Sequence, residues 1–470
     1  MSRVYLSFLG TNDYVPCTYV FPDGTDEPKN VRFVQEATVS YCCRDWGPDD
    51  QVVILTTDEA EGKNWVDDGH RDKEGNVLKR KGLQKCLAEL GIGARVRRVP
   101  IPDGKKEEEL WKIFEIILEQ IREGAEVVFD VTHALRSIPM LAITALNYAK
   151  VMKGVSLRGI YYGAFEVLGS IEEAKGKPLA NRRVPVFDLG MFDRLFEWSF
   201  ALDRFLGAGD ATHACELARR WSIRPLNGSA LDKATQKHLT QLAEHLERFS
   251  KVMSTCRGRE IMGAARALQD SIDPEAASHL PPPLRLLMGP LRDRLAVFRG
   301  ELVNDGIEAA RWCLEHNLIQ QGITILREVL TQHMTVLGGG KPDSLDHREL
   351  VAAAVEIYRT GTAKENWRGR ARGNPSLTEK YLEVLRSEPD LADVFTRLGD
   401  ARNDMNHAGF REEAKNSSEF SQILNETIDW AKRFASQDPI STRGATQGTL
   451  GAHARRETGT RGPLRPGEIP

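Results

Sequence analysis

The feature that most constrains the fold is an apolar run that ends in an acid, passes through a polar loop and resumes as a helical pattern. The run covers residues 127–129, the acid is Asp130, and Pro139 opens an apolar segment over 140–152 with helical spacing. This order predicts a buried strand, a tight loop and the N-terminus of a helix. Such a junction presents free backbone N–H groups at a positive dipole end, so it can hold an anion, especially phosphate.

The loop after this strand carries four side chains that can donate hydrogen bonds to a phosphate, namely Thr132, His133, Arg136 and Ser137. An ordinary strand-to-helix turn with capping residues has the same spacing. The loop residues by themselves leave both interpretations open.

Short apolar runs alternate with amphipathic segments over residues 1–187, which predicts βαβ units with a mostly parallel, Rossmann-like sheet. We expect strands at 4–9, 14–21, 31–33, 52–55, 96–101, 127–129, 155–162 and 184–187. We expect helices at 35–41, 78–90, 107–121 and 140–152. The second and third strands would form a hairpin through Pro22, Asp23 and Gly24.

The pattern changes after residue 187. Residues 188–207 form one apolar-rich helical segment, residues 208–435 have helical period nearly throughout, and residues 436–470 lack apolar periodicity. The sequence therefore predicts an α/β domain, a connecting helix, an all-α domain and a disordered tail.

Polar residues follow three of the predicted strands. They are Gly10, Thr11 and Asn12 after the first strand, Thr56, Thr57 and Asp58 after another, and the loop over 132–137. Because ligands of parallel sheets bind at the carboxyl ends of the strands, we expect all three groups to line one edge.

Composition limits where and how such a protein can act. The formal net charge of −3 provides no general basic field, so any RNA contact must come from a local basic patch. Seven cysteines are scattered without a C-x-x-C pair, which fits reduced thiols in a cytoplasm and indicates no metal site. No apolar stretch approaches the ~18 residues of a membrane span, and the N-terminal run is too short for a signal peptide. We therefore expect a soluble, cytoplasmic protein.

The helical half contains Arg402 and His407, separated by five positions. That is about 140° around a continuous helix, so either the helix loosens between them or another chain completes the pair. In metal-independent RNA cleavage, His can polarise the ribose 2′-OH and Arg can stabilise the charge on the pentavalent phosphate. Asn403 and Asp404 could orient these groups.

This spacing is weak evidence on its own, since it should occur about once by chance in a chain so rich in Arg. A second pair with the same spacing, Arg311 and His316, encloses Trp312, Cys313 and Leu314 and is typical of an amphipathic core helix. We favour the first pair. Glu328 could assist it, although a solvated position is the ordinary expectation for a helical glutamate.

With these residues in view, the chain resembles the CRISPR-associated ribonucleases that join an N-terminal CARF domain to a C-terminal HEPN domain. The resemblance spans about residues 1–435 and rests on four segments. They are Ser7-Phe8-Leu9-Gly10-Thr11-Asn12, the stretch over 130–139, the junction from Val186-Phe187-Asp188-Leu189 into the helix of Trp198, and Arg402-Asn403 with His407. The stretch over 130–139 is similar to the signature D-x-T-H-G-x-R-x-x-P, with Ala134 in place of the usual Gly.

The resemblance implies a CARF dimer that binds a cyclic oligoadenylate made by a type III CRISPR effector, with the cyclic tetra-adenylate favoured. Binding would activate a HEPN dimer that cuts single-stranded RNA without any cofactor. Arg402 and His407 would be catalytic and Asn403 would support them. The messenger site would contain Gly10, Thr11, Asn12, Thr132, His133, Arg136 and Ser137.

Three alternatives remain. The HEPN half could be a non-catalytic dimerisation bundle, or the CARF half could itself degrade the messenger through His133 or Thr132. A Rossmann-like metabolic enzyme is the third, but the chain has neither G-x-G-x-x-G nor a Walker A motif.

Overall fold

The computed structural model describes residues 2–133, 138–223, 232–280, 282–410 and 412–436. Their packing divides the chain into two units. The first comprises described residues of Met1–Ala201, Glu216–Thr240 and Leu280–Leu284, and the second those of Leu202–Cys215, Gln241–His279 and Arg285–Pro470. The domain boundaries expected at residues 187, 207 and 435 stay predictions, because this division reflects packing and not function. The expected tail beyond 436 lies outside the described residues.

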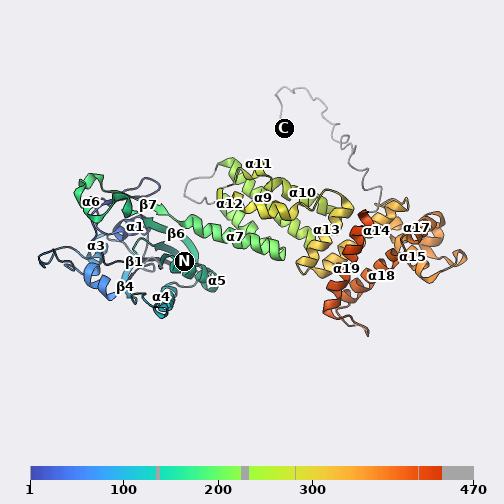
Figure 1. Cartoon of the computed structure of the whole chain (residues 1–470), viewed down its shortest axis with the longest axis horizontal. Helices are drawn as coiled ribbons and strands as arrows, with labels where there is room; N and C mark the ends of the chain where they lie inside the picture. The colour runs from blue at the N-terminus through green and yellow to red at the C-terminus, as the bar shows by residue number, and fades with distance from the viewer. Residues whose placement is uncertain (1, 134–137, 224–231, 281, 411, 437–470) are drawn as a thin grey trace, which may run out of the picture. The chain divides into compact units, whose positions relative to one another are not determined.

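Seven strands form one sheet in the first unit, in the order β2-β7-β6-β5-β1-β3-β4 (Figure 1). The strands are β1 Arg3–Leu9, β2 Thr18–Val20, β3 Gln51–Thr56, β4 Arg95–Pro100, β5 Glu126–Asp130, β6 Ser156–Gly163 and β7 Arg183–Asp188. Neighbouring strands run parallel except β6 and β7, which are antiparallel. The predicted Rossmann-like α/β domain is confirmed.

Strand β1 shows why both faces of the sheet are covered by helices. Val4, Leu6 and Phe8 pack into a buried apolar cluster with α4 and α5, whereas Tyr5 and Leu9 pack into a second cluster with α1 and α3. Because successive side chains of a strand point to opposite faces, a strand with apolar side chains on both faces has to be buried on both. The helices are α1 Val34–Cys42, α3 Leu83–Glu89, α4 Glu107–Gln120 and α5 Ile138–Lys153. Shorter pieces are α2 Asp58–Ala60, η1 Glu61–Trp65, η2 Phe165–Leu168, α6 Ile171–Gly176 and η3 Leu179–Asn181.

Two local predictions are wrong. The hairpin between 14–21 and 31–33 is absent from this described region, because β2 pairs in parallel with β7 and only Cys17 and Val31 bridge across. Pro22 and Pro28 lack the backbone N–H groups that a hairpin ladder would need between them. The helix expected at 78–90 begins only at Leu83, after Gly82 in extended conformation.

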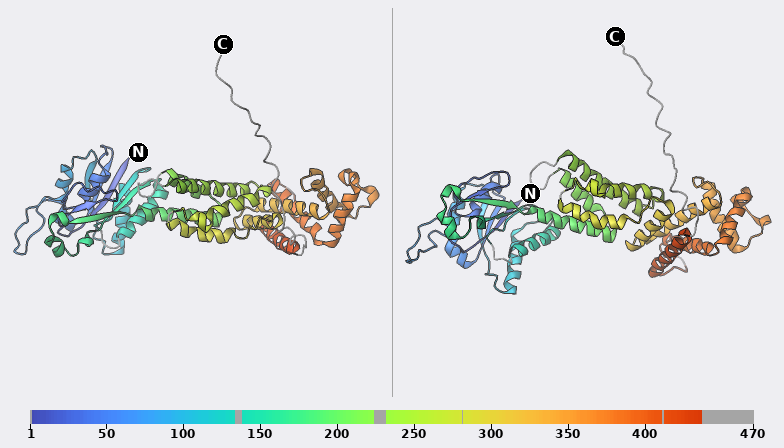
Figure 2. Two further views of the ribbon diagram at one scale, coloured as in Figure 1. Left: turned by 90° about the horizontal axis from the view of Figure 1, so that it is seen from above. Right: turned by 45° about the horizontal axis from the view of Figure 1, so that its top comes forward.

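The rest of the described chain is helical, as predicted (Figure 2). They are α7 Gly190–Ala208, α8 Thr212–Ile223, α9 Lys233–Ser254, η4 Gly258–Glu260, α10 Ile261–Ile272, α11 Pro274–Ala277, α12 Pro282–Leu295, α13 Leu302–Glu315, α14 Ile319–Leu337, α15 Leu345–Thr360, η5 Lys364–Asn366, α16 Gly369–Gly373, α17 Pro375–Ser387, α18 Asp390–Asn406 and α19 Ser417–Ser436. Buried residues of α13, α14, α15, α17, α18 and α19 share one apolar cluster. Among the described residues, no helix combines the length and apolar character needed to cross a membrane.

The second Arg-to-His pair lies in this helical core. Trp312 and Cys313 are buried, and the His316 ring makes hydrogen bonds to the backbone carbonyls of Trp312 and Leu206. A histidine held in this way fills space and caps a carbonyl. The expectation that Arg311 and His316 belong to a core helix is met by this packing.

Candidate functional site

A buried carboxylate organises the carboxyl end of β5. Asp130 is fully buried and accepts hydrogen bonds from the Tyr5 hydroxyl at 3.0 Å and the Thr38 hydroxyl at 3.1 Å. It also accepts the Thr132 hydroxyl at 2.6 Å and the Thr132 N–H at 3.0 Å. Burial raises the pKa of Asp130, and these four donors oppose that rise. The network therefore fixes β1, β5 and α1 to one another beside the loop that follows.

Thr132 extends this network to the next strand. Its hydroxyl donates to Asp130 and accepts the backbone N–H of Gly163, at the end of β6, at 2.9 Å. The Thr132 hydroxyl thus donates one hydrogen bond and accepts another within the protein. Thr132 holds the edge of the sheet in place.

The glycine turn after β1 is held from the side by Asn64 of η1. The Asn64 amide donates to the backbone carbonyls of Gly10 and Asn12, each at 2.9 Å. A Cβ atom on Gly10 would come within 2.4 Å of the Tyr14 hydroxyl oxygen. Glycine is therefore required there because the Tyr14 side chain packs directly against the turn.

A cavity of about 310 Å³ opens at this edge of the sheet. Its walls include Asn12, Asp13, Tyr14, Arg32, Thr132 and His133, and residues at and beyond the end of β6, among them Tyr162 and Glu166. The cavity lies where the ends of β1, β5 and β6 meet, which is the usual place for a ligand of a parallel sheet.

Two buried nitrogen atoms in the cavity wall, the Nε2 atom of His133 and the Nε atom of Arg32, have no hydrogen-bond partner among the residues that the structure describes. Burial lowers the pKa of His133 to about 3, so its ring is neutral at physiological pH. The ring packs against Tyr14 with centroids 4.3 Å apart. Buried polar groups are nearly always paired, so these two atoms indicate a place for a ligand.

Charged groups of both signs surround the cavity. Arg32 donates to Asn64 at 3.1 Å, and burial followed by nearby Arg80 lowers the pKa of Arg32. Asp13 pairs with Arg80 and, at 3.2 Å, with Lys175. These two cations neutralise Asp13, so the Arg32 guanidinium in the wall remains to attract an anion, beside the carboxylate of Glu166.

Of the predicted messenger residues, Asn12, Thr132 and His133 line the cavity, and Gly10 shapes its wall. Thr11 is half-buried beside them without lining it. Arg136 and Ser137 lie outside the described residues. Arg32 was not among the predicted site residues. A cation between Val31 and Phe33, in an apolar run, is a signal that could have identified it.

The candidate nuclease residues lie at the end of α18. Arg402 is in its last turns, and its Nη1 atom lies 3.7 Å from Oε1 of Glu328 on α14. His407 caps the helix and is exposed, with its backbone N–H donated to the carbonyls of Asn403 and Asp404. Helix α18 is continuous through Asn406, so it does not loosen between Arg402 and His407. No hydrogen bond or ion pair joins these two described side chains.

The residues between them have different surroundings. Asn403 is exposed, whereas Asp404 is buried and accepts the backbone N–H of Lys415 at 2.7 Å. Asp404 therefore fixes the segment that follows α18. Asp404 was expected to orient Arg402 and His407, but among the described residues no hydrogen bond joins its side chain to either of them.

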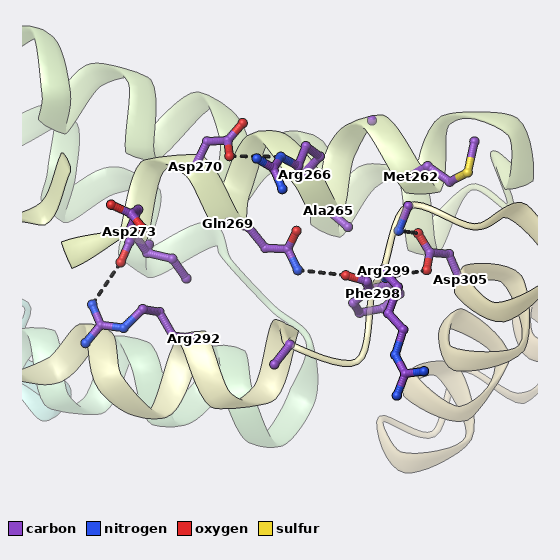
Figure 3. A pocket seen from close by; sticks show the side chains of 14 residues that line it. Met262, Ala265, Arg266, Gln269, Asp270, Asp273, Arg292, Phe298, Arg299 and Asp305 are labelled. Carbon is purple, nitrogen blue, oxygen red and sulfur yellow. Dashed lines mark hydrogen bonds and ion pairs between the residues drawn. The ribbon is translucent and has the colours of Figure 1, made fainter. Parts of the chain in front are cut away.

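A larger pocket of about 720 Å³ lies among α10, α12 and the start of α13 (Figure 3). Asp305 accepts the backbone N–H groups of Arg299 and Gly300, and Gln269 donates to the carbonyls of Leu295 and Phe298. These contacts tie the turn between α12 and α13 to α10. The pocket is built by polar groups that satisfy one another, so it carries no argument for a ligand.

Comparisons with known proteins match most of the first unit's α/β domain. Residues 4–166 match the family described as CRISPR system endoribonuclease Csx1, CARF domain. The chain is also similar to the CRISPR-associated protein MJ1674 of Methanocaldococcus jannaschii, with 21% identity over 384 residues. That alignment covers 79% of this chain, while the chain spans about half, 52%, of the relative's length.

The matched residues 4–166 run from β1 into η2 and include every described residue expected to contact the messenger, whereas Gly169, Ser170 and Ile171 of the cavity wall lie beyond the match. The family match does not extend into the helical half. We conclude that residues 4–166 of the first unit are similar to the CARF domain of the Csx1 family, and that the chain is similar to a CRISPR-associated protein.

Proposed function

We propose that the CARF cavity binds a cyclic oligoadenylate and that this binding activates RNA cleavage by the helical half. The observation that carries the sensor assignment is the pair of nitrogen atoms, on His133 and Arg32, that have no partner among the described residues, in a cavity whose Asp13 carboxylate is neutralised by Arg80 and Lys175. Phosphates of the messenger would pair with Arg32 and with the helix N-terminus after the loop over 132–137. Tyr14 and Tyr162 offer aromatic surface for adenine.

A homodimer is part of this proposal. On α7, Phe192, Phe196 and Phe200 recur every fourth residue and are 51%, 46% and 62% exposed. Apolar surface of this kind is characteristic of protein interfaces. A cyclic tetra-adenylate has two-fold symmetry, so a C2 dimer would present two copies of the cavity residues to matching halves of the ring. We favour that ring size.

In the helical half, Arg402 and His407 would perform metal-independent cleavage. His407 would take the proton of a ribose 2′-OH as its oxygen attacks the phosphorus atom, and Arg402 would stabilise the pentavalent phosphate. The 5′-oxygen of the next nucleotide then leaves, giving a 2′,3′-cyclic phosphate. The exposed position of His407 supports a site completed by a second copy, with Asn403 as a supporting group.

The deciding experiment measures cleavage of labelled single-stranded RNA with cyclic tri-, tetra- and hexa-adenylate, each with excess EDTA. We expect cleavage only with an activating ring, undiminished by EDTA, and lost in Arg402→Ala. A strict need for Mg²⁺ or Mn²⁺ would overturn the mechanism, and wild-type cleavage by Arg402→Ala would overturn the catalytic assignment.

The alternative is a sensor or ring nuclease whose helical half is not catalytic. The neutral His133 ring in the cavity is the observation that favours it, since an unprotonated imidazole can accept a proton. A pKa of about 3 makes that ring a weak base at neutral pH, which argues for binding over catalysis. Incubation of labelled cyclic tetra-adenylate with the protein, followed by chromatography, separates the two.

A further inference from the structure

Three arginines from three helices gather around one carboxylate in the helical half. Arg327 and Glu328 lie on α14, Arg348 on α15 and Arg402 on α18, three helices that lie together in Figure 1. The Nη1 atoms of Arg327 and Arg402 lie 3.6 Å and 3.7 Å from Glu328 Oε1, and Arg348 pairs with Oε2. We call these four residues the arginine cluster.

The cluster carries an excess of positive charge. Within the part of the chain that the structure describes, Glu328 is the one carboxylate that pairs with these three guanidinium groups. Burial, and then the neighbouring Arg402, lower the pKa of Arg327. Like charges held together at this density repel one another unless an anion joins them.

Two guanidinium groups in the cluster also have a buried N–H group that donates no hydrogen bond within the described residues. The Nε atoms of Arg327 and Arg348 are buried and have no hydrogen-bond partner in the described part of the chain, although both side chains remain about a quarter exposed, at 26% and 23%. A cluster that served only to join helices would be expected to use these donors on the protein. Open donors, net positive charge and partial exposure together describe a site for an anion.

We propose that Arg327 and Arg348, held by Glu328, bind a backbone phosphate of single-stranded RNA next to the phosphate that Arg402 contacts. The proposal rests on the proposed RNase function for the identity of the ligand. A chain with a net charge of −3 has no general attraction for RNA, so a local cluster has to supply it. Glu328 would moderate the positive charge of the cluster, because it pairs with both phosphate-binding arginines and with Arg402.

The test measures binding of a fluorescent 2′-O-methyl oligoribonucleotide, which lacks the 2′-OH needed for cleavage, with and without cyclic tetra-adenylate. The variants are Arg327→Gln, Arg348→Gln and the double variant, and Arg397→Gln is the control. Arg397 lies on α18, outside the cluster, and pairs with Glu426. All variants are first compared with wild type by circular dichroism and thermal unfolding.

We expect each cluster variant to bind about tenfold to a hundredfold more weakly, as charge-assisted phosphate contacts are lost. The slope of log K against log salt should become shallower by roughly 0.7 for each arginine removed. Arg397→Gln should bind as wild type. Glu328→Gln should bind more tightly, because it removes the negative charge beside the phosphate.

If the folded double variant binds within twofold of wild type with an unchanged salt slope, the cluster is structural and the proposal fails. Weaker binding in Glu328→Gln likewise contradicts it. The binding experiment and the cleavage experiment can fail independently of each other. Cleavage that survives Arg402→Ala removes the catalytic assignment yet leaves the binding result standing, and binding unaffected by the cluster variants leaves the catalytic assignment standing.

Discussion

The hydroxyl of Tyr5 donates to the carboxylate of Asp130 at 3.0 Å, across 125 positions of sequence. Tyr5 lies on β1 and Asp130 ends β5, and these two strands are neighbours in the sheet. The bond sits directly behind the candidate messenger cavity. It joins the strand that leads into the glycine turn to the strand that leads into the signature loop.

This relationship makes Asp130 a structural residue. We expect Asp130→Ala to lower the free energy of unfolding by about 1–3 kcal/mol, since it leaves buried donors of Tyr5, Thr38 and Thr132 without an acceptor. Asp130→Asn should cost less, because its amide keeps one acceptor and the Tyr5 and Thr38 hydroxyls can accept from its NH₂ group. Urea denaturation of both variants measures the difference. Equal stability of wild type and Asp130→Ala would contradict this account.

A second prediction concerns the contact between Gly10 and Tyr14. Gly10→Ala should weaken binding of cyclic tetra-adenylate and destabilise the domain by about 1–3 kcal/mol, because the new methyl group overlaps the Tyr14 hydroxyl. Adding Tyr14→Phe removes the overlapping oxygen atom, so the double variant should recover much of the stability. Thermal unfolding and calorimetry of the two single variants and the double variant test this. No recovery in the double variant would show that another contact requires the glycine.

The pH dependence of stability should report on His133. The pKa of His133 is about 3 in the folded protein, below its ordinary value of 6.5. Between these two pH values, the unfolded chain therefore binds a proton at His133 more readily than the folded protein does. Stability contributed by neutral His133 is therefore present above about pH 6.5 and is lost as pH falls toward 3, by up to about 1.4 kcal/mol per pH unit. We expect His133→Gln to flatten the fall in unfolding free energy between pH 6.5 and pH 5. An identical slope in wild type and variant would mean that His133 is not buried as described.

The arrangement of Arg402 and His407 can be tested by mixing subunits. Each of Arg402→Ala and His407→Ala should lose about 10²–10⁴ in cleavage rate while binding cyclic tetra-adenylate normally. If one copy supplies Arg402 and the other His407, refolded mixtures of the two variants should regain roughly a quarter of the wild-type rate. Arg311→Ala, in the other pair of the same spacing, is the control and should cleave normally. A mixture as inactive as its parents would place both residues of a site in one chain.

Much of the fold follows from local sequence. The run of apolar residues in β1, alternating between two buried clusters, and the acid that ends β5 predicted a parallel sheet covered on both faces. The helical period after residue 187 predicted the second unit. These predictions were correct because the spacing of apolar residues along the chain indicates which strands are buried and which helices are amphipathic.

The exact partners were decided by tertiary structure. Segment 14–21 gave only the short β2, since its partner, β7, lies more than 150 residues away, and no local pattern encodes that pairing. Arg32 lines the cavity, and Asn64 holds the glycine turn beside it, through contacts with segments distant in sequence that spacing along the chain cannot reveal.

The sequence by itself determined the chemistry that is available: a loop with phosphate donors, a glycine turn, and an Arg and a His in the helical half. Tertiary structure alone decided which of these groups meet. It brought Asn12, Thr132 and His133 to one cavity, placed Arg402 beside Glu328 and left His407 exposed. The physical reason is that burial and electrostatic environment depend on what packs around a side chain, and those neighbours come from elements far away in the chain.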